Sequence, residues 1–211
     1  MSETIVLIFQ FIVLIFSVMI HEISHGFVAE RLGDNTARVA GRLTLNPLKH
    51  IDPFGSIILP LLLYIFNTSI LFGWAKPVPY NPYNLKNPKT GGAIIALAGP
   101  VSNFFIAFIF GLLIRFGISS GNSLDDPLLI LFQVIVYINI LLGVFNLVPI
   151  PPLDGSKVLF GFLPSGLISP TVMRFFEQNG MIILVMFMFF GFKLIFPIMG
   201  FLFKVFTGLA F

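Results

Sequence analysis

The stretch that decides the fold lies near the start of the chain, where residues 5–25 read IVLIFQFIVLIFSVMIHEISH. Its first part, residues 5–20, is almost wholly apolar and runs directly into His21-Glu22-Ile23-Ser24-His25. A span across the hydrocarbon core needs about 20 predominantly apolar residues. We therefore expect one long transmembrane helix over residues 4–31, ended by a cap at Gly33.

The composition of the whole chain supports a membrane setting. Of its 211 residues, 57% are hydrophobic and 10% are charged, and the mean hydropathy is +1.00. A soluble domain has about 25% charged residues, so a soluble globule and a disordered chain are both excluded. The length fits one domain, which we expect to occupy residues 1–211 as a single integral-membrane unit. The net charge of +3 is spread over few charges, so it indicates membrane topology rather than a nucleic-acid partner.

Further apolar stretches predict the rest of the architecture. Three are long enough to span the bilayer, at residues 91–117, 127–148 and 181–206. Two stretches with loose alternation or many prolines, residues 36–45 and 74–81, predict short β-strands or extended segments. The expected fold class is an all-α polytopic membrane protein with about four transmembrane helices, a re-entrant hydrophobic segment and short β-strands near the active site.

The re-entrant segment is inferred from the positions of basic residues. Seven of the 12 Lys and Arg residues fall within residues 31–89, on both sides of the apolar segment 55–73. The positive-inside rule places both flanks in the cytoplasm, and a segment with both ends on one side does not span. The alternative is a plain transmembrane helix over 55–73, with residues 74–90 outside. With four spans, both termini lie on the same face of the membrane. Because residues 31–89 are placed in the cytoplasm, that face is the outer one.

The H-E-x-x-H pattern of residues 21–25 is the strongest chemical signal. Side chains at positions i and i+4 of a helix lie on one face, so His21 and His25 can occupy two corners of a tetrahedral zinc site. Glu22 lies beside that site and can act on an attacking water molecule. The plainer alternative is an interfacial polar cluster that marks the helix end. The chain has no Cys, so a metal must be held by His, Asp or Glu.

A third ligand must come from elsewhere in the chain. Asp154 is favoured, because it follows a long apolar helix and the breaker Pro149-Ile150-Pro151-Pro152. Unwound backbone at membrane depth occurs where it lines a cavity. His50 is the second candidate, although a loop role suits it better.

Two asparagines are candidates for substrate positioning. Asn146 lies at the end of the third span, where its amide can hold an extended substrate or, equally, cap the helix. Asn103 follows Ala98-Gly99-Pro100, and for it a hydrogen bond between packed helices is the favoured alternative to substrate contact.

Together these residues resemble the site-2 protease family of intramembrane zinc metalloproteases. The match comprises His21-Glu22-x-x-His25, Ala98-Gly99-Pro100 with Asn103, and Phe145-Asn146-Leu147-x-Pro149-x-Pro151-x-Leu153-Asp154-Gly155. The resemblance covers roughly residues 5–163 and indicates a compact form without PDZ or CBS domains. It implies one zinc ion per chain on His21, His25 and Asp154, with Glu22 as the catalytic residue and Asn146 as the substrate-positioning one.

The function implied by the resemblance is zinc-dependent endopeptidase activity within the bilayer, usually on regulatory membrane proteins. The expected substrate is a membrane protein whose transmembrane segment carries helix-weakening residues. The competing hypothesis is a metal-ion transporter that uses the same His/Asp cluster. We expect a multi-pass protein of the cell membrane. The count of 16 residues from Ile5 to His21 puts the active site within the bilayer near the cytoplasmic face.

Overall fold

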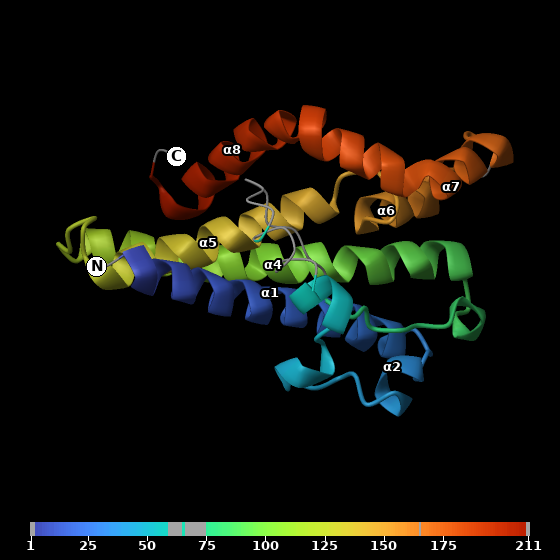
Figure 1. Cartoon of the computed structure of the whole chain (residues 1–211), viewed down its shortest axis with the longest axis horizontal. Helices are drawn as coiled ribbons and strands as arrows, with labels where there is room; N and C mark the ends of the chain where they lie inside the picture. Colours follow the sequence, from blue (N-terminus) through green and yellow to red (C-terminus); the bar gives the residue numbers. More distant parts are fainter. Residues whose placement is uncertain (1–2, 59–64, 66–74, 165, 210–211) are drawn as a thin grey trace.

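The computed structural model describes residues 3–58, 65, 75–164 and 166–209, and within them the chain is mainly helical (Figure 1). The α-helices are α1 (Glu3–Arg31), α2 (Thr36–Val39), α4 (Pro88–Ser119), α5 (Pro127–Asn146), α6 (Asp154–Phe162), α7 (Pro170–Met186) and α8 (Ile195–Thr207). Short 3₁₀ or π turns are η1 (Pro47–Lys49), η2 (Pro53–Ile58), η3 (Pro82–Asn84), η4 (Phe187–Gly191) and η5 (Phe192–Leu194).

Helix α4 lies at the centre of the bundle and packs against α1, α5, α6 and α8. The main apolar core is shared by α4, α5 and α8 and contains Ala107, Ile114, Val136, Ile140, Val144, Ile195, Met199 and Phe203. The start of α1 and the end of α8 lie at the same end of the bundle (Figure 1). The end of α1, the short α2 and the start of α4 lie at the opposite end, which is therefore where the polar connecting segments gather.

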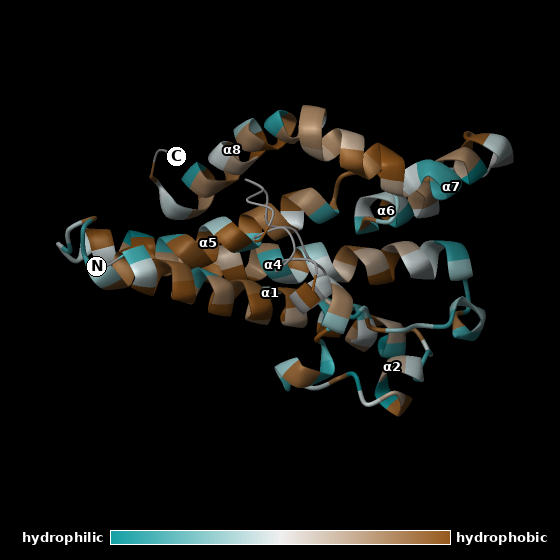
Figure 2. Ribbon diagram, in the orientation of Figure 1, coloured by the Kyte–Doolittle hydropathy of each residue, from teal (hydrophilic) through white to brown (hydrophobic). Residues whose placement is uncertain are grey.

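Four helical stretches are long and apolar enough to cross a membrane: Glu3–Arg31, Pro88–Ser119, Pro127–Asn146 and Thr171–Thr207. Figure 2 shows hydrophobic residues along these helices and hydrophilic ones around α2 and its neighbouring loops. Within the described part of the chain, the prediction of four helices long and apolar enough to span is confirmed. The fourth begins about ten residues earlier than the predicted 181–206, because α7 starts at Pro170 and its helix runs on into the apolar stretch, although Arg174 and Glu177 make its first turns more polar.

Local sequence explains where these helices begin and end. Helices α4, α5 and α7 each start with a proline, which has no N–H to leave unsatisfied. The preceding Asn87, Asp126 and Ser169 accept a backbone N–H through their side chains, as N-caps do. After α1 the backbone turns at Gly33 with φ of 106°, a left-handed conformation, so the predicted glycine at the helix end is confirmed.

The predicted β-strands are not found within the described residues. Residues 36–39 form α2 instead, so the strand prediction for residues 36–45 is wrong. The reason is local: the Asp34 carboxylate accepts the backbone N–H and the hydroxyl of Thr36, which starts a helical turn. Residues 75–80 form neither helix nor turn and run as an elongated stretch (Figure 1), in line with the predicted extended segment, but they belong to no sheet.

Most of the predicted re-entrant segment 55–73 lies outside the described residues. Near the other end of the chain, the fourth span is interrupted by η4 and η5, just before Pro197. A proline ring clashes with the carbonyl four residues earlier, which here belongs to Lys193 in η5. The irregular part of this span therefore lies in the turns that precede Pro197 rather than at the proline itself.

A buried polar network joins α1, α4 and α5 inside the apolar bundle. The Asn103 amide donates to Asn139 Oδ1 at 3.0 Å and to the Ser17 carbonyl at 3.4 Å. The Asn139 amide donates in turn to the Ser17 hydroxyl at 2.9 Å. Both asparagines have no exposed surface. Because lipid offers no hydrogen bonds, each of these groups depends on the other two helices for its partners.

Replacing Asn139 tests this network. We expect Asn139→Leu to lower the free energy of unfolding by about 1–3 kcal/mol, because it leaves the Ser17 hydroxyl and one Asn103 N–H without their partner. The thermal midpoint in detergent is the measurement. Asn179→Leu is the matched control, since the Asn179 amide, like that of Asn139, donates to the carbonyl four residues earlier but is only half-buried on α7. Equal midpoints for the two variants would contradict the prediction.

Candidate metal centre

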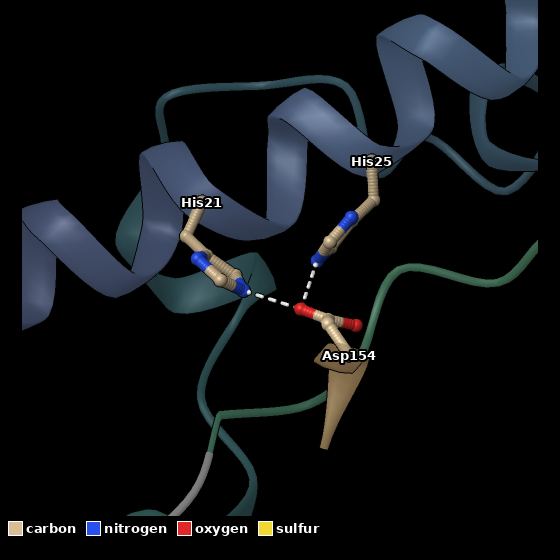
Figure 3. A group of neighbouring side chains, drawn as sticks. All are labelled: His21, His25 and Asp154. Carbon is tan, nitrogen blue, oxygen red and sulfur yellow. Dashed lines mark hydrogen bonds and ion pairs between the residues drawn. The ribbon is translucent and has the colours of Figure 1, made fainter. Parts of the chain in front are cut away.

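The three predicted ligands converge on one point. His21 and His25 lie one turn apart on α1 with ring centroids 4.7 Å apart, and Asp154 is the first residue of α6. The Nε2 atoms of both imidazoles lie 3.1 Å from Asp154 Oδ2. Figure 3 shows the two rings projecting from the same face of α1 towards the carboxylate. His21 and Asp154 are buried, with 5% and 9% of their surface exposed, so this is an enclosed site rather than a surface cluster.

Outer hydrogen bonds fix the orientation of both imidazoles. His21 Nδ1 lies 2.6 Å from Asn103 Oδ1, and His25 Nδ1 lies 2.7 Å from the Ile95 carbonyl. Both partners are acceptors, because the Asn103 N–H groups point to Ser17 and Asn139. Each Nδ1 therefore carries the proton, and each Nε2 lone pair faces Asp154. A ligating His in a metal site has this arrangement.

The donor set fits zinc. Ligands about 2.0–2.1 Å from a tetrahedral Zn²⁺ lie about 3.3 Å from one another. The candidate atoms of the cluster lie within 4.8 Å of one another, and the two His–Asp separations are close to that tetrahedral edge. Two imidazoles and one carboxylate leave a fourth position for water or substrate, which is the composition of catalytic rather than structural zinc sites.

Glu22 lies beside this cluster and lines the same cavity. The cavity has a volume of about 170 Å³, and its lining includes His21, Glu22, His25, Asn146 and Asp154. Glu22 Oε2 accepts the backbone N–H of Val78 at 2.8 Å, which brings the extended segment after residue 74 over the site. A carboxylate is therefore held next to three metal-type ligands in one small, partly polar space.

The loop before α6 explains how Asp154 reaches the histidines. Helix α5 ends at Asn146, and the chain turns through hydrogen bonds from Ile150 N to Val148 O and from Leu153 N to Ile150 O. The next residue, Gly155, lies so close to the end of α5 that a Cβ atom there would be 2.2 Å from the Leu147 carbonyl. The predicted breaker thus folds Asp154 back against the bundle.

The remaining predicted residues fall into different places. His50 lies in the polar segment, where its Nε2 is 2.9 Å from the Thr44 carbonyl, and the structure brings Asp154 rather than His50 to the histidine pair. Asn146 lines the cavity, and its amide also donates to the Leu142 carbonyl at 2.9 Å. Both expectations for Asn146, helix-end bonding and a position beside the substrate space, are therefore compatible with its geometry.

Asn103 departs from its predicted substrate-positioning role. It is fully buried, it is not among the residues that line the cavity, and its amide is used by His21, Ser17 and Asn139. In this structure the amide therefore faces the packed helices rather than the cavity. The structure instead makes Asn103 the residue that orients His21, which agrees with the helix-packing alternative.

Gly99 is a site residue whose role sequence reasoning missed. A Cβ atom at this position would lie 2.5 Å from Cε1 and Nε2 of His21 and 2.6 Å from Cε1 of His25. The backbone of α4 can pass behind both imidazoles because position 99 has no side chain. The signal was present in Ala98-Gly99-Pro100, but the spacing alone does not say what the glycine faces.

Comparison with known proteins supports the chemistry of this cluster. The sequence model of "Peptidase family M50" matches residues 115–190. "Putative zinc metalloprotease YwhC" of Bacillus subtilis is 41% identical over 159 residues, which are 74% of this chain and 69% of the relative. "Putative zinc metalloprotease Rip2" of Mycobacterium tuberculosis is 30% identical over 147 residues, 68% of this chain and 52% of that protein.

A more distant relative is "Zinc metalloprotease MJ0392" of Methanocaldococcus jannaschii, 27% identical over 77% of this chain and 38% of its own length. The chain thus spans about half of Rip2 and less of the archaeal protein. No solved structure matches the chain. The metal-ion transporter alternative has no support among these relatives. By its identity to YwhC over most of both chains, this chain belongs to peptidase family M50, the zinc metalloproteases of the site-2 protease type.

Proposed function

We propose that the chain is a zinc-dependent intramembrane endopeptidase that hydrolyses peptide bonds in or near the transmembrane segments of membrane proteins. The observation that carries this proposal is the position of four residues around one cavity: His21, Glu22, His25 and Asp154. The first three lie on α1, a helix that is apolar enough to span. A catalytic site at the end of such a helix is reached by substrates that share the bilayer.

The residues have separate tasks in this proposal. His21, His25 and Asp154 would hold the metal, and Zn²⁺ supplies Lewis-acid polarisation of the scissile carbonyl and a water of lowered pKa. Glu22 takes a proton from the attacking water and delivers it to the leaving amine. Asn146, on the cavity wall, hydrogen-bonds the substrate backbone through its amide.

The substrate must be locally unwound when it reaches this cavity. The carbonyl groups of a transmembrane helix are hydrogen-bonded within the helix, so attack by water requires an extended segment. We infer a substrate with helix-weakening residues near the cut. We propose that residues 75–80, which run beside the cavity, accept this strand, whereas residues 36–45 begin as helix and suit that role less well.

This extended segment offers few backbone donors. Pro77 and Pro79 have no N–H, and the N–H groups of Lys76, Val78 and Asn81 already donate within the chain. A substrate strand that pairs here is therefore held chiefly by its own N–H groups, which donate to carbonyl oxygens of the segment.

The orientation and depth of the site follow from the basic residues and from helix length. The polar segments that carry most of the Lys and Arg residues lie at the end of the bundle where α1 finishes, which we place in the cytoplasm. His21 is 16 residues, or about 24 Å, beyond Ile5, and the hydrocarbon core is about 30 Å thick. The metal would then lie inside the cytoplasmic leaflet of the cell membrane, a short distance from water.

Replacing Glu22 by glutamine tests metal binding and catalysis separately. We expect Glu22→Gln to keep about one zinc per chain, because Glu22 is not a ligand, and to lower cleavage of a tagged membrane substrate by at least about 100-fold. Metal analysis of the purified protein and fragment formation are the two measurements. Wild-type cleavage rates in Glu22→Gln would overturn the proposed function.

Gly99 provides a test of the ligand geometry that leaves every ligand in place. We expect Gly99→Ala to lower the zinc content strongly, because its methyl group would overlap both imidazoles. Gly92→Ala is the matched control on the same helix, since its methyl group would meet just the Tyr80 hydroxyl, at an ordinary 3.6 Å. Equal zinc contents in the two variants would contradict the placement of α4 behind the histidines.

Cysteine accessibility tests depth and orientation, because the chain has no native Cys. A membrane-impermeant thiol reagent supplied from the cytoplasm should label Lys157→Cys, at the cavity, and Tyr83→Cys, on an exposed turn. It should not label Phe11→Cys, which is 47% exposed but on the lipid-facing first half of α1. Labelling of Tyr83→Cys from the outside alone would reverse the proposed orientation.

A further inference from the structure

Residues 75–81, which we name the strap, pass over Glu22 in extended conformation. Val78 lies between Pro77 and Pro79, so its N–H is the single backbone donor of those three residues. That N–H donates to Glu22 Oε2 at 2.8 Å. A proline fixes its own φ and restricts the residue before it to extended conformations, so this part of the strap has few backbone conformations to choose from before any substrate arrives.

Arg42 fixes the strap on one side of Val78. Its guanidinium donates to the carbonyls of Lys76, at 2.5 Å, and Pro77, at 3.2 Å, and also to the Lys49 carbonyl. Arg42 is only 7% exposed although it pairs with no carboxylate among the described residues. A buried guanidinium that donates hydrogen bonds to backbone carbonyls holds a loop in place. Two of its acceptors here are the carbonyls of the two residues that immediately precede Val78.

Asp34 fixes the other side. Its carboxylate accepts the backbone N–H of Asn81 at 2.7 Å and the side-chain amide of Asn84 at 2.7 Å. Burial opposes the charged form of Asp34, but hydrogen bonds from Thr36, Asn81 and Asn84 outweigh it and hold its pKa below the usual range. The Asp34 carboxylate therefore stays charged at neutral pH.

The strap also lies directly against α1. A Cβ atom on Gly26 would be 2.8 Å from Val78 Cγ1 and 2.5 Å from Leu43 Cδ2, so the glycine permits this close approach. The contact is one helical turn beyond Glu22. The strap around Val78 is thus held by three contacts: those of Arg42, those of Asp34, and the packing of Val78 against Gly26 of α1.

We propose that Arg42 is a positioning residue for catalysis, which acts by holding the Val78 N–H on Glu22. The proposal rests on the proposed role of Glu22 as the proton-transferring group. With one carboxylate oxygen bonded to Val78, the flexible Glu22 side chain keeps one orientation, and among the described residues its second oxygen, Oε1, accepts no hydrogen bond. Loss of the anchor should lower kcat more than it raises KM, because a misplaced proton acceptor affects the reaction step rather than substrate binding.

The first experiment removes the Val78 donor and little else. Val78→Pro deletes the N–H in a segment that is already extended, whereas Val78→Ala keeps the N–H and trims the side chain. In the full-length protein, we expect kcat for a tagged membrane substrate to fall about 10- to 100-fold in Val78→Pro, and far less in Val78→Ala, at unchanged zinc content. Equal losses in the two variants would overturn the proposal, since the side chain rather than the donor would then matter.

The second experiment asks whether Arg42 acts through Val78. We expect Arg42→Ala to lower kcat by a factor similar to Val78→Pro, and Arg42→Lys to recover part of it. Arg38→Ala is the control, because Arg38 pairs with Glu30 on the exposed side of the same segment. The double variant Arg42→Ala/Val78→Pro should lose no more than Val78→Pro alone. Multiplicative losses, or a loss in Arg42→Ala explained entirely by lower zinc content or folded fraction, would show a merely structural role.

A third measurement does not depend on cleavage. Amide hydrogen exchange of a peptide that contains the strap should become at least about tenfold faster at one amide in Glu22→Ala, and faster at several amides in Arg42→Ala. Unchanged exchange in both variants would refute the Val78–Glu22 contact even if the chain is a protease. Faster exchange combined with full cleavage by Glu22→Gln would instead leave the contact intact and refute the proposed function.

Discussion

The structure depends on the hydrogen bond between His21 and Asn103. An imidazole inside a transmembrane helix needs a protein partner, because hydrocarbon offers none and an unpaired polar group there costs several kcal/mol. Asn103 provides that partner, and Ser17 and Asn139 in turn satisfy the other groups of its amide. The same four side chains therefore hold three helices together and set the tautomer of a metal ligand. Stability and chemistry are not separable at this point of the bundle.

This requirement explains the central place of α4. Asn103 reaches His21 when α4 lies directly against α1, and that approach passes behind both imidazoles at Gly99. Helix α5 completes the arrangement from the other side, because it carries Asn139 and ends at Asn146, from which the proline-rich turn leads to Asp154 at the start of α6. One helix therefore both closes the polar network and delivers the third ligand, which fixes the distance between the network and the metal site.

Sequence reasoning succeeded where a residue type leaves few alternatives. The apolar helices follow from apolar length, and the grouping of His21, His25 and Asp154 follows from helical spacing and from the breaker before Asp154, in a chain without Cys. Sequence reasoning failed where the conformation or role of a residue depends on the side chain that it contacts. Residues 36–39 fit a strand and a helical turn equally well, and the Asp34 carboxylate settles the matter through a contact two residues away. Asn103 shows the same limit, since nothing in its spacing distinguishes an amide that orients a ligand from one that contacts substrate.

His21 and Glu22 are neighbours in the sequence but have different surroundings. Successive side chains on a helix point about 100° apart, so His21 faces α4 and α6 while Glu22 faces the strap. The proposed metal ligands are thus oriented by apolar helices whose few polar groups bond one another, and the proposed proton-transferring residue is oriented by a polar segment outside those helices. The site therefore contains one part that the helix bundle orients and one part that the polar segment orients.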